Sequence, residues 1–179
     1  MQRIRMMGWT LLALAPAILW AQSEKAQVIK EKDVNEAALV NMLTPEPQMR
    51  TRSIRVSREG APQAAAPSAS LLITFQTNSA QLTPQARQSL EIVGRALKSE
   101  KLSEYAFSVE GHADPRGNEE ANLKLSQARA ESVAAYLSGA QQIDRARLKP
   151  VGKGQSELMN TTNPAAPENR RVTIKTITN

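Results

Sequence analysis

From residue 71 onward the hydrophobic pattern alternates between two periods, and this alternation restricts the fold more than any other feature of the chain. Short runs with apolar residues at every second position predict strands, and longer runs with intervals of three or four predict helices. Thr83 followed by proline is a typical helix start. The expected strands cover residues 71–76, 105–110, 148–151 and 171–177, and the expected helices cover residues 84–98 and 118–137.

These elements follow one another in the order β-α-β-α-β-β. The strands alternate apolar with polar residues, whereas a parallel sheet covered on both faces has strands that are apolar throughout. We therefore expect an α/β fold, a two-layer sandwich in which a small mixed sheet of about four strands has its helices packed on one face. The helical residues expected to face the sheet are Ala86, Leu90, Val93 and Leu97, then Leu125, Ala128, Val133, Tyr136 and Leu137.

The first 21 residues have the pattern of a signal peptide. Arg3 and Arg5 precede an apolar run, and small residues follow at a cleavage site. The alternative, a membrane anchor, is disfavoured because the run is short and contains Pro16. No later segment is apolar enough to cross a bilayer, and the chain has no cysteine for a lipid anchor or a disulfide. We therefore expect an exported, periplasmic protein without a transmembrane segment in the mature chain.

Residues 22–69 are expected to form an N-terminal arm and an Ala/Pro-rich linker, leaving residues 70–179 as the folded domain. The arm contains a short helical patch between Val34 and Leu43 and a strand-like alternation over residues 51–57, but no core of its own. Two interpretations stay open. The arm is either flexible or, over residues 22–60, a segment that docks an envelope protein and becomes ordered on binding.

The segment from Val109 to Ala130 contains the residues with the clearest chemistry. Asp114 lies in a polar loop after a strand, and Asn122, Ser126 and Arg129 share one edge of the following helix. Helical side chains lean toward the N-terminus, so Arg129 leans toward the loop of Asp114. A fixed carboxylate and a fixed guanidinium suit the ammonium and the carboxylate of an amino-acid zwitterion. The alternative is a structural salt bridge between the two side chains.

Enzymatic and nucleic-acid functions are disfavoured by what the sequence lacks. His112 is the only histidine, so with no cysteine there is no zinc ligand set, and no serine stands in a nucleophile elbow. Glu110 and Asp114 give no reason for the raised pKa that a catalytic acid needs. The formal net charge of +6 is spread among acidic residues rather than gathered in a stripe. We therefore expect no enzyme activity, no cofactor, no metal and no nucleic acid.

A family resemblance rests on many matched positions in one order. They are Phe75, Asn78-Ser79, Leu82-Thr83, Gly111-His112-Ala113-Asp114, Gly117, Asn122, Leu125-Ser126, Arg129-Ala130, Val133, Leu137, Gly152-Lys153-Gly154 and Asn169-Arg170-Arg171-Val172. This set resembles the peptidoglycan-binding domain of the OmpA-like family over about residues 70–177. The resemblance implies a soluble periplasmic protein that holds the diaminopimelate residue of the cell-wall stem peptide.

The resemblance also implies roles for individual residues. Asp114 would take the ammonium of diaminopimelate and Arg129 its carboxylate. Phe75, Gln76, Asn122 and Leu125 would line the groove, and Arg170 or Arg171 would approach the peptide from the last strand. Core packing is an equal alternative for Phe75 and Leu125, and Arg171 has the alternative of a surface position. Two positions depart from the family, Ala113 where threonine is usual and Lys153 where an aromatic residue is commoner.

Overall fold

A computed structural model describes residues 28–45, 66–76 and 79–178. In these residues a five-stranded sheet has the order β1-β2-β5-β3-β4. Its strands are β1 (Val28–Lys30), β2 (Ser68–Leu72), β3 (Ala106–His112), β4 (Leu148–Gly154) and β5 (Val172–Ile177), and its helices are α1 (Glu36–Leu43), α2 (Pro84–Lys98) and α3 (Glu119–Gly139). Short 3-10 turns lie at η1 (Glu31–Asp33), η2 (Arg145–Arg147) and η3 (Pro167–Asn169).

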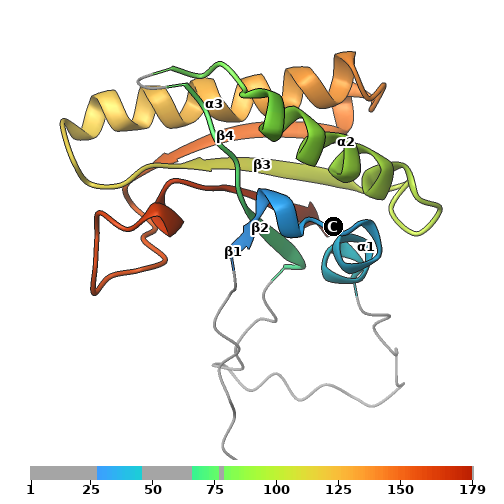
Figure 1. The fold of residues 1–179 in the computed structure, drawn as a ribbon. Coiled ribbons are helices and arrows are strands. Elements are labelled where there is room, and N and C mark those ends of the chain that lie inside the picture. The colour runs from blue at the N-terminus through green and yellow to red at the C-terminus, as the bar shows by residue number, and fades with distance from the viewer. Residues whose placement is uncertain (1–27, 46–65, 77–78, 179) are drawn as a thin grey trace, which may run out of the picture.

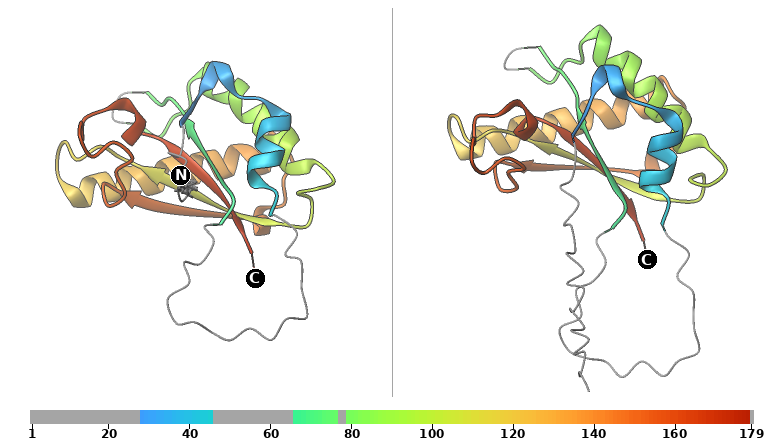
Figure 2. Two further views of the ribbon diagram at one scale, coloured as in Figure 1. Left: turned by 90° about the horizontal axis from the view of Figure 1, so that it is seen from below. Right: turned by 60° about the horizontal axis from the view of Figure 1, so that its bottom comes forward.

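The sheet is mixed because the last strand is inserted in its centre. β5 pairs antiparallel with both β2 and β3, while β1 runs parallel to β2 and β4 runs parallel to β3. The helices α2 and α3 cross the same side of the sheet (Figure 1), and α1 lies beside α2 (Figure 2). The predicted α/β sandwich with helices on one face is therefore confirmed, with a fifth strand and a third helix added before the predicted order.

One hydrophobic core lies between the sheet and the helices. Alternate residues of β3 and β5, such as Phe107, Val109 and Ile174, are fully buried there. The predicted stripe of α2 is confirmed, because Ala86, Leu90, Val93 and Leu97 are all completely buried. Thr83 accepts a hydrogen bond from the backbone of Ala86 and caps α2 as the sequence predicts.

Residues 28–45 correct the expectation of an arm outside the domain. β1 extends the sheet, and Leu39 and Leu43 of α1 are completely buried in the shared core. Thr176 of β5 donates a hydrogen bond from its Oγ1 to the carbonyl oxygen of Leu43. The segment is too small to form a core of its own, but it completes one supplied by the rest of the chain. The predicted signal peptide and the strand-like run at 51–57 lie outside the described residues.

Two further details differ from the sequence pattern. β2 ends at Leu72, so Phe75 lies beyond the strand, in an isolated antiparallel bridge with Leu82. In α3 the buried face includes Ser126 and Ala130, whereas Leu125 and Ala128 are only half-buried. At Ser126 the helix lies so close to β3 and β4 that a small residue faces the sheet. Further along α3, Val133 and Leu137 are completely buried, as predicted.

Glycines make this close approach possible. A Cβ atom at Gly111 of β3 would lie 2.2 Å from the backbone oxygen of Ser126, and one at Gly152 of β4 would lie 2.7 Å from the backbone nitrogen of Gln127. In return the helix binds the strand directly: the backbone N–H of Gly154 donates to Ser126 Oγ at 2.9 Å. This contact fixes the position of α3, and with it the helical residues of the candidate site.

Candidate ligand-binding site

Asp114 lies in the loop between β3 and α3, and Asn122 holds that loop in place. Gly117 turns the loop with a φ of 97°, a conformation that favours glycine. The side-chain nitrogen of Asn122 lies 3.0 Å from the carbonyl oxygen of Asp114 and 3.2 Å from that of Arg116. Asn122 therefore anchors the loop to α3 rather than lining a pocket.

The Asp114 carboxylate is almost completely buried and is bound by two arginines. Its Oδ1 accepts from the backbone N–H and from Nε of Arg116, both at 3.1 Å, and its Oδ2 accepts from Arg116 Nη2 and Arg170 Nη1, both at 2.8 Å. The pKa of Asp114 lies far below its usual range. The main cause is the hydrogen bond from the Arg116 side chain, and the hydrogen bond from Arg170 adds to it, whereas burial acts in the opposite direction. Asp114 is therefore ionised.

Arg129 is held near this carboxylate without pairing with it. Its Nε donates to the carbonyl oxygen of Ser79 at 3.2 Å, and its guanidinium carbon lies 4.9 Å from the ring centroid of Phe75. Burial lowers the pKa of Arg129, and the neighbouring charge of Arg170 adds to this effect, but a guanidinium keeps its proton. Among the described ion pairs Asp114 contacts Arg116 and Arg170, so the alternative of a direct Asp114–Arg129 bridge is wrong.

A pocket of about 290 Å³ brings four of the predicted residues together. It is lined by Leu72, Ile73, Thr74, Phe75, His112, Arg129, Pro167, Arg170 and Arg171. Arg170 connects this pocket to the Asp114 carboxylate. The other four predicted residues do not line it, namely Asp114, Gln76, Asn122 and Leu125. Phe75 both lines the pocket and packs against the core, so its two alternative roles coexist.

His112 and Arg171 contribute buried polar groups to the pocket wall. His112 is 2% exposed, and neither ring nitrogen has a hydrogen-bond partner in the described protein. Arg171 is 7% exposed, so it is not a surface residue, and its Nε and Nη1 also lack partners there. Burial, and next the charge of Arg171, lower the pKa of His112 from the ordinary 6.5 to about 3. The imidazole is neutral at physiological pH.

This lowered pKa makes a prediction about acid stability. Below pH 6.5 the unfolded chain protonates His112, whereas the folded chain does so only near pH 3, so stability falls as the pH decreases through this range. One pKa unit corresponds to about 1.4 kcal/mol, which gives up to about 3 kcal/mol between about pH 7 and about pH 4. Thermal denaturation should show a smaller acid-induced loss for His112→Leu than for the wild type. An equal loss in both proteins would contradict this assignment.

His112 belongs to a cluster of possible metal ligands whose carboxylates already form ion pairs with lysines. Ligand atoms of Glu110, His112 and Glu157 lie within 4.8 Å of one another. However, Lys153 Nζ lies 2.8 Å from Glu157 and 3.8 Å from Glu110, and Lys175 Nζ lies 2.6 Å from Glu110. Two ammonium groups therefore already balance the two carboxylates, and a divalent cation would meet them at close range. The unusual residue Lys153 has this pairing role.

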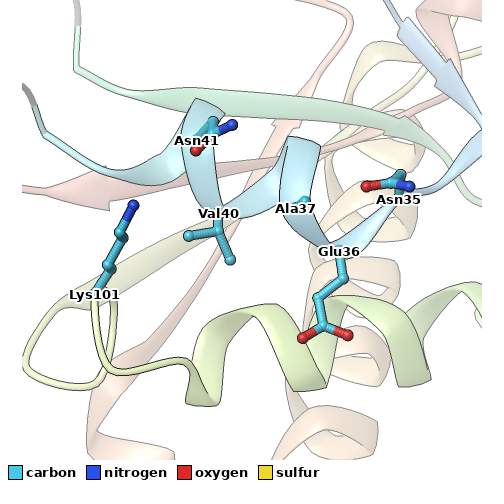
Figure 3. A pocket seen from close by; sticks show the side chains of 6 residues that line it. All are labelled: Asn35, Glu36, Ala37, Val40, Asn41 and Lys101. Carbon is cyan, nitrogen blue, oxygen red and sulfur yellow. The ribbon is translucent and has the colours of Figure 1, made fainter.

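A second pocket, of about 460 Å³, lies at the other end of the fold between α1 and the loop after α2 (Figure 3). It is lined by Asn35, Glu36, Ala37, Val40, Asn41 and Lys101. Apart from the half-buried Val40 these residues are exposed, and no buried polar group faces the cavity. Of these two pockets, the pocket of Arg129 is the one that combines buried charged and polar groups with a concave surface.

The comparison with known proteins identifies the family. The model of the OmpA family matches residues 74–171, more than half of the chain. The chain belongs to the OmpA family. The match begins next to Phe75 and includes Asp114, Arg129 and the pair Arg170 and Arg171.

Relatives within the OmpA family agree with this assignment. The chain is 38% identical over 104 residues to the outer-membrane lipoprotein YfiB of Pseudomonas aeruginosa, covering 57% of this chain and 60% of that protein. It is 33% identical over 103 residues to the peptidoglycan-associated lipoprotein of the same species, covering 56% of this chain and 59% of that protein. The crystal structure of the peptidoglycan-associated lipoprotein of Burkholderia pseudomallei matches with a TM-score of 0.50 and 25% identity, covering 68% of this chain and 98% of that one.

The OmpA family match covers only part of the described fold. The chain spans about three fifths of the length of the two relatives from Pseudomonas aeruginosa. β1, η1, α1 and β2 precede the matched residues, although they share the core with them. Among the described residues, no helix has both the length and the apolar character to cross a membrane.

Three residues of the site were missed by the sequence reasoning. The role of Arg116 had a local signal, since an arginine two positions after a loop aspartate can return to its carboxylate. His112 had no local signal, because the strand contact that places it beside Arg171 joins residues far apart in the sequence. Thr74 had no signal, because its partner is distant in the sequence.

Proposed function

We propose that this chain binds peptidoglycan non-covalently and recognises the diaminopimelate residue of its stem peptide. One observation supports this most strongly: Asp114 and Arg129 are opposite charges on a rigid frame that do not neutralise each other. No described residue binds Arg129 Nη1 or Nη2, so two parallel donors are available to a carboxylate. The names of the peptidoglycan-associated relatives agree with peptidoglycan as the ligand.

In this proposal the two ends of one zwitterion bind to different elements. The ligand ammonium binds the Asp114 carboxylate in the loop before α3, and the ligand carboxylate binds Arg129, about three turns into that helix. Phe75 packs beside the methylene chain that joins them, and Arg170 and Arg171 bind the adjoining peptide. No step requires bond cleavage, so the protein acts as a non-enzymatic anchor in the periplasm that tethers the envelope to the cell wall. Docking of an envelope protein by residues 22–60 stays a prediction, although residues 28–45 of that range already pack against the rest of the domain.

Co-sedimentation with insoluble peptidoglycan tests this function. The purified protein should pellet with walls whose stem peptides contain diaminopimelate and stay in the supernatant with walls that contain lysine, because lysine lacks the carboxylate assigned to Arg129. Free diaminopimelate should release the pelleted protein. Equal pelleting with both walls would exclude the zwitterion as the recognised group, and no pelleting with either would exclude peptidoglycan.

The contacts of Arg116 make a prediction about affinity. In the free protein Arg116 occupies the carboxylate that the ligand ammonium needs, and its side chain is 66% exposed. An exposed ion pair of this kind is weak because solvent screens it, so Arg116 is a weak competitor, and Arg116→Ala should bind diaminopimelate-containing peptidoglycan about two- to fivefold more tightly.

The matched control is Arg95→Ala, which removes the same charge from an exposed pair with Glu36 and should leave the affinity unchanged. Binding isotherms from the pelleting assay measure both variants. Weaker binding by Arg116→Ala would show that Arg116 contacts the ligand instead of competing with it.

A further inference from the structure

A carboxylate from outside the matched family region reaches the loop that holds Arg129. Glu31 of η1 is 9% exposed, and its Oε1 accepts from the backbone N–H of Thr74 at 2.6 Å and from Thr74 Oγ1 at 2.8 Å. The backbone oxygen of Glu31 also accepts from Ser89 Oγ of α2 at 3.1 Å. Glu31 is thus fixed at both its backbone and its side chain, and it fixes Thr74 in turn.

The hydroxyl groups extend this contact to the start of α2. Thr74 Oγ1 gives its single hydrogen to the Glu31 carboxylate, so at 2.8 Å it must accept from Thr83 Oγ1. Thr83 is the residue that caps α2, where it accepts from the backbone of Ala86. Glu31, Thr74 and Thr83 therefore form one line of hydrogen bonds that joins η1, the segment after β2 and α2.

Thr74 begins the hairpin that contacts Arg129. Phe75 and Leu82 form its antiparallel bridge, and the backbone N–H of Gln76 donates to the oxygen of Gln81 at 3.0 Å. The hairpin provides both contacts of Arg129, namely the Phe75 ring and the carbonyl oxygen of Ser79. A displacement of Thr74 would move both contacts together.

We infer that Glu31 is a positioning residue for the ligand site, because it holds the hairpin that orients the Arg129 guanidinium. This inference rests on the proposed function for its effect on binding, but its effect on Arg129 is independent of any ligand. It also gives residues 28–45 a role in recognition that the family match over residues 74–171 does not contain.

Two measurements on the full chain test this role. The first is the ¹H–¹⁵N resonance of Arg129 Nε–H in the free protein, which reports its hydrogen bond to Ser79. Glu31→Ala should shift or broaden this resonance and weaken binding to diaminopimelate-containing peptidoglycan about five- to tenfold, at a temperature where circular dichroism shows a folded protein. Glu31→Gln keeps an acceptor oxygen and should restore most of both properties.

The control is Glu36→Ala, which removes another carboxylate that joins the same segment to α2, through Arg95. It should change neither the resonance nor the affinity. An unchanged Arg129 Nε–H resonance in Glu31→Ala would overturn the inference, as would a changed resonance with unchanged affinity. If the wild type does not bind peptidoglycan while the resonance still shifts, the proposed function fails and the positioning of Arg129 stands.

Discussion

Replacing either Asp114 or Arg129 with alanine should abolish retention of the protein on the cell wall. Asp114→Ala and Arg129→Ala each remove one partner of a buried, charge-assisted contact with the ligand, a change that costs about 2–5 kcal/mol in comparable interfaces. The dissociation constant for diaminopimelate-containing peptidoglycan should therefore rise at least about thirtyfold in both variants. The pelleting assay measures this effect directly.

A conservative variant of Arg129 separates the effect of its charge from the effect of its hydrogen-bond geometry. Arg129→Lys keeps the charge but loses the two parallel donors, so its affinity should lie between those of the wild type and Arg129→Ala. Glu120→Ala and Lys124→Ala are matched controls, since they remove an acid and a base that pair with each other on the exposed face of α3. Retained binding by Asp114→Ala or by Arg129→Ala would contradict the proposed clamp.

A methyl group at Gly111 should be among the most destabilising small changes in the protein. The added Cβ would lie 2.2 Å from the Ser126 oxygen and 3.0 Å from its carbonyl carbon, both backbone atoms of α3. Backbone cannot move aside as a flexible side chain can, so the helix must lift from the sheet. Overpacking in a well-packed core costs about 1–3 kcal/mol and sometimes more, and we expect Gly111→Ala to reach the upper end of this range.

Gly139 provides the control in the same helix. An added Cβ there meets no atom within 4 Å, and alanine is the better helix former by about 1 kcal/mol. Urea denaturation should therefore place Gly111→Ala well below the wild type and Gly139→Ala at or above it. Equal stability of the two variants would show that α3 can shift without cost, and the close contact would then lose its role in placing Arg129.

Local patterns were sufficient for the parts of the fold that local interactions determine. The cap at Thr83, the apolar stripe of α2 and the loop position of Asp114 follow from residues a few positions apart, and the structure contains all three. That Arg129 leans toward the loop of Asp114 stays a prediction from the helical spacing, and its described contacts are with Ser79 and Phe75.

The features that the sequence did not predict depend on contacts between residues far apart in the sequence or on how closely two elements pack. The burial of Leu39 and Leu43 requires a core that other segments build, and the contact between Glu31 and Thr74 joins residues 43 positions apart. Val133 and Leu137 of α3 are buried as predicted, whereas Leu125 and Ala128 are only half-buried. An apolar stripe shows which side of a helix is hydrophobic, but it does not show how close the sheet lies. Here glycines on β3 and β4 bring the sheet so near that Ser126 faces it.

The central place of β5 determines when the sheet can assemble. β2 and β3 have no ladder between them except through β5, which follows both of them in the chain. The two halves of the sheet therefore cannot join until β5 itself has been synthesised. Both central ladders depend on contacts between residues far apart in the sequence, and such contacts form slowly during folding. Without β5, the strand pairs β1-β2 and β3-β4 would have no ladder between them, and only the helices would join the two halves of the fold.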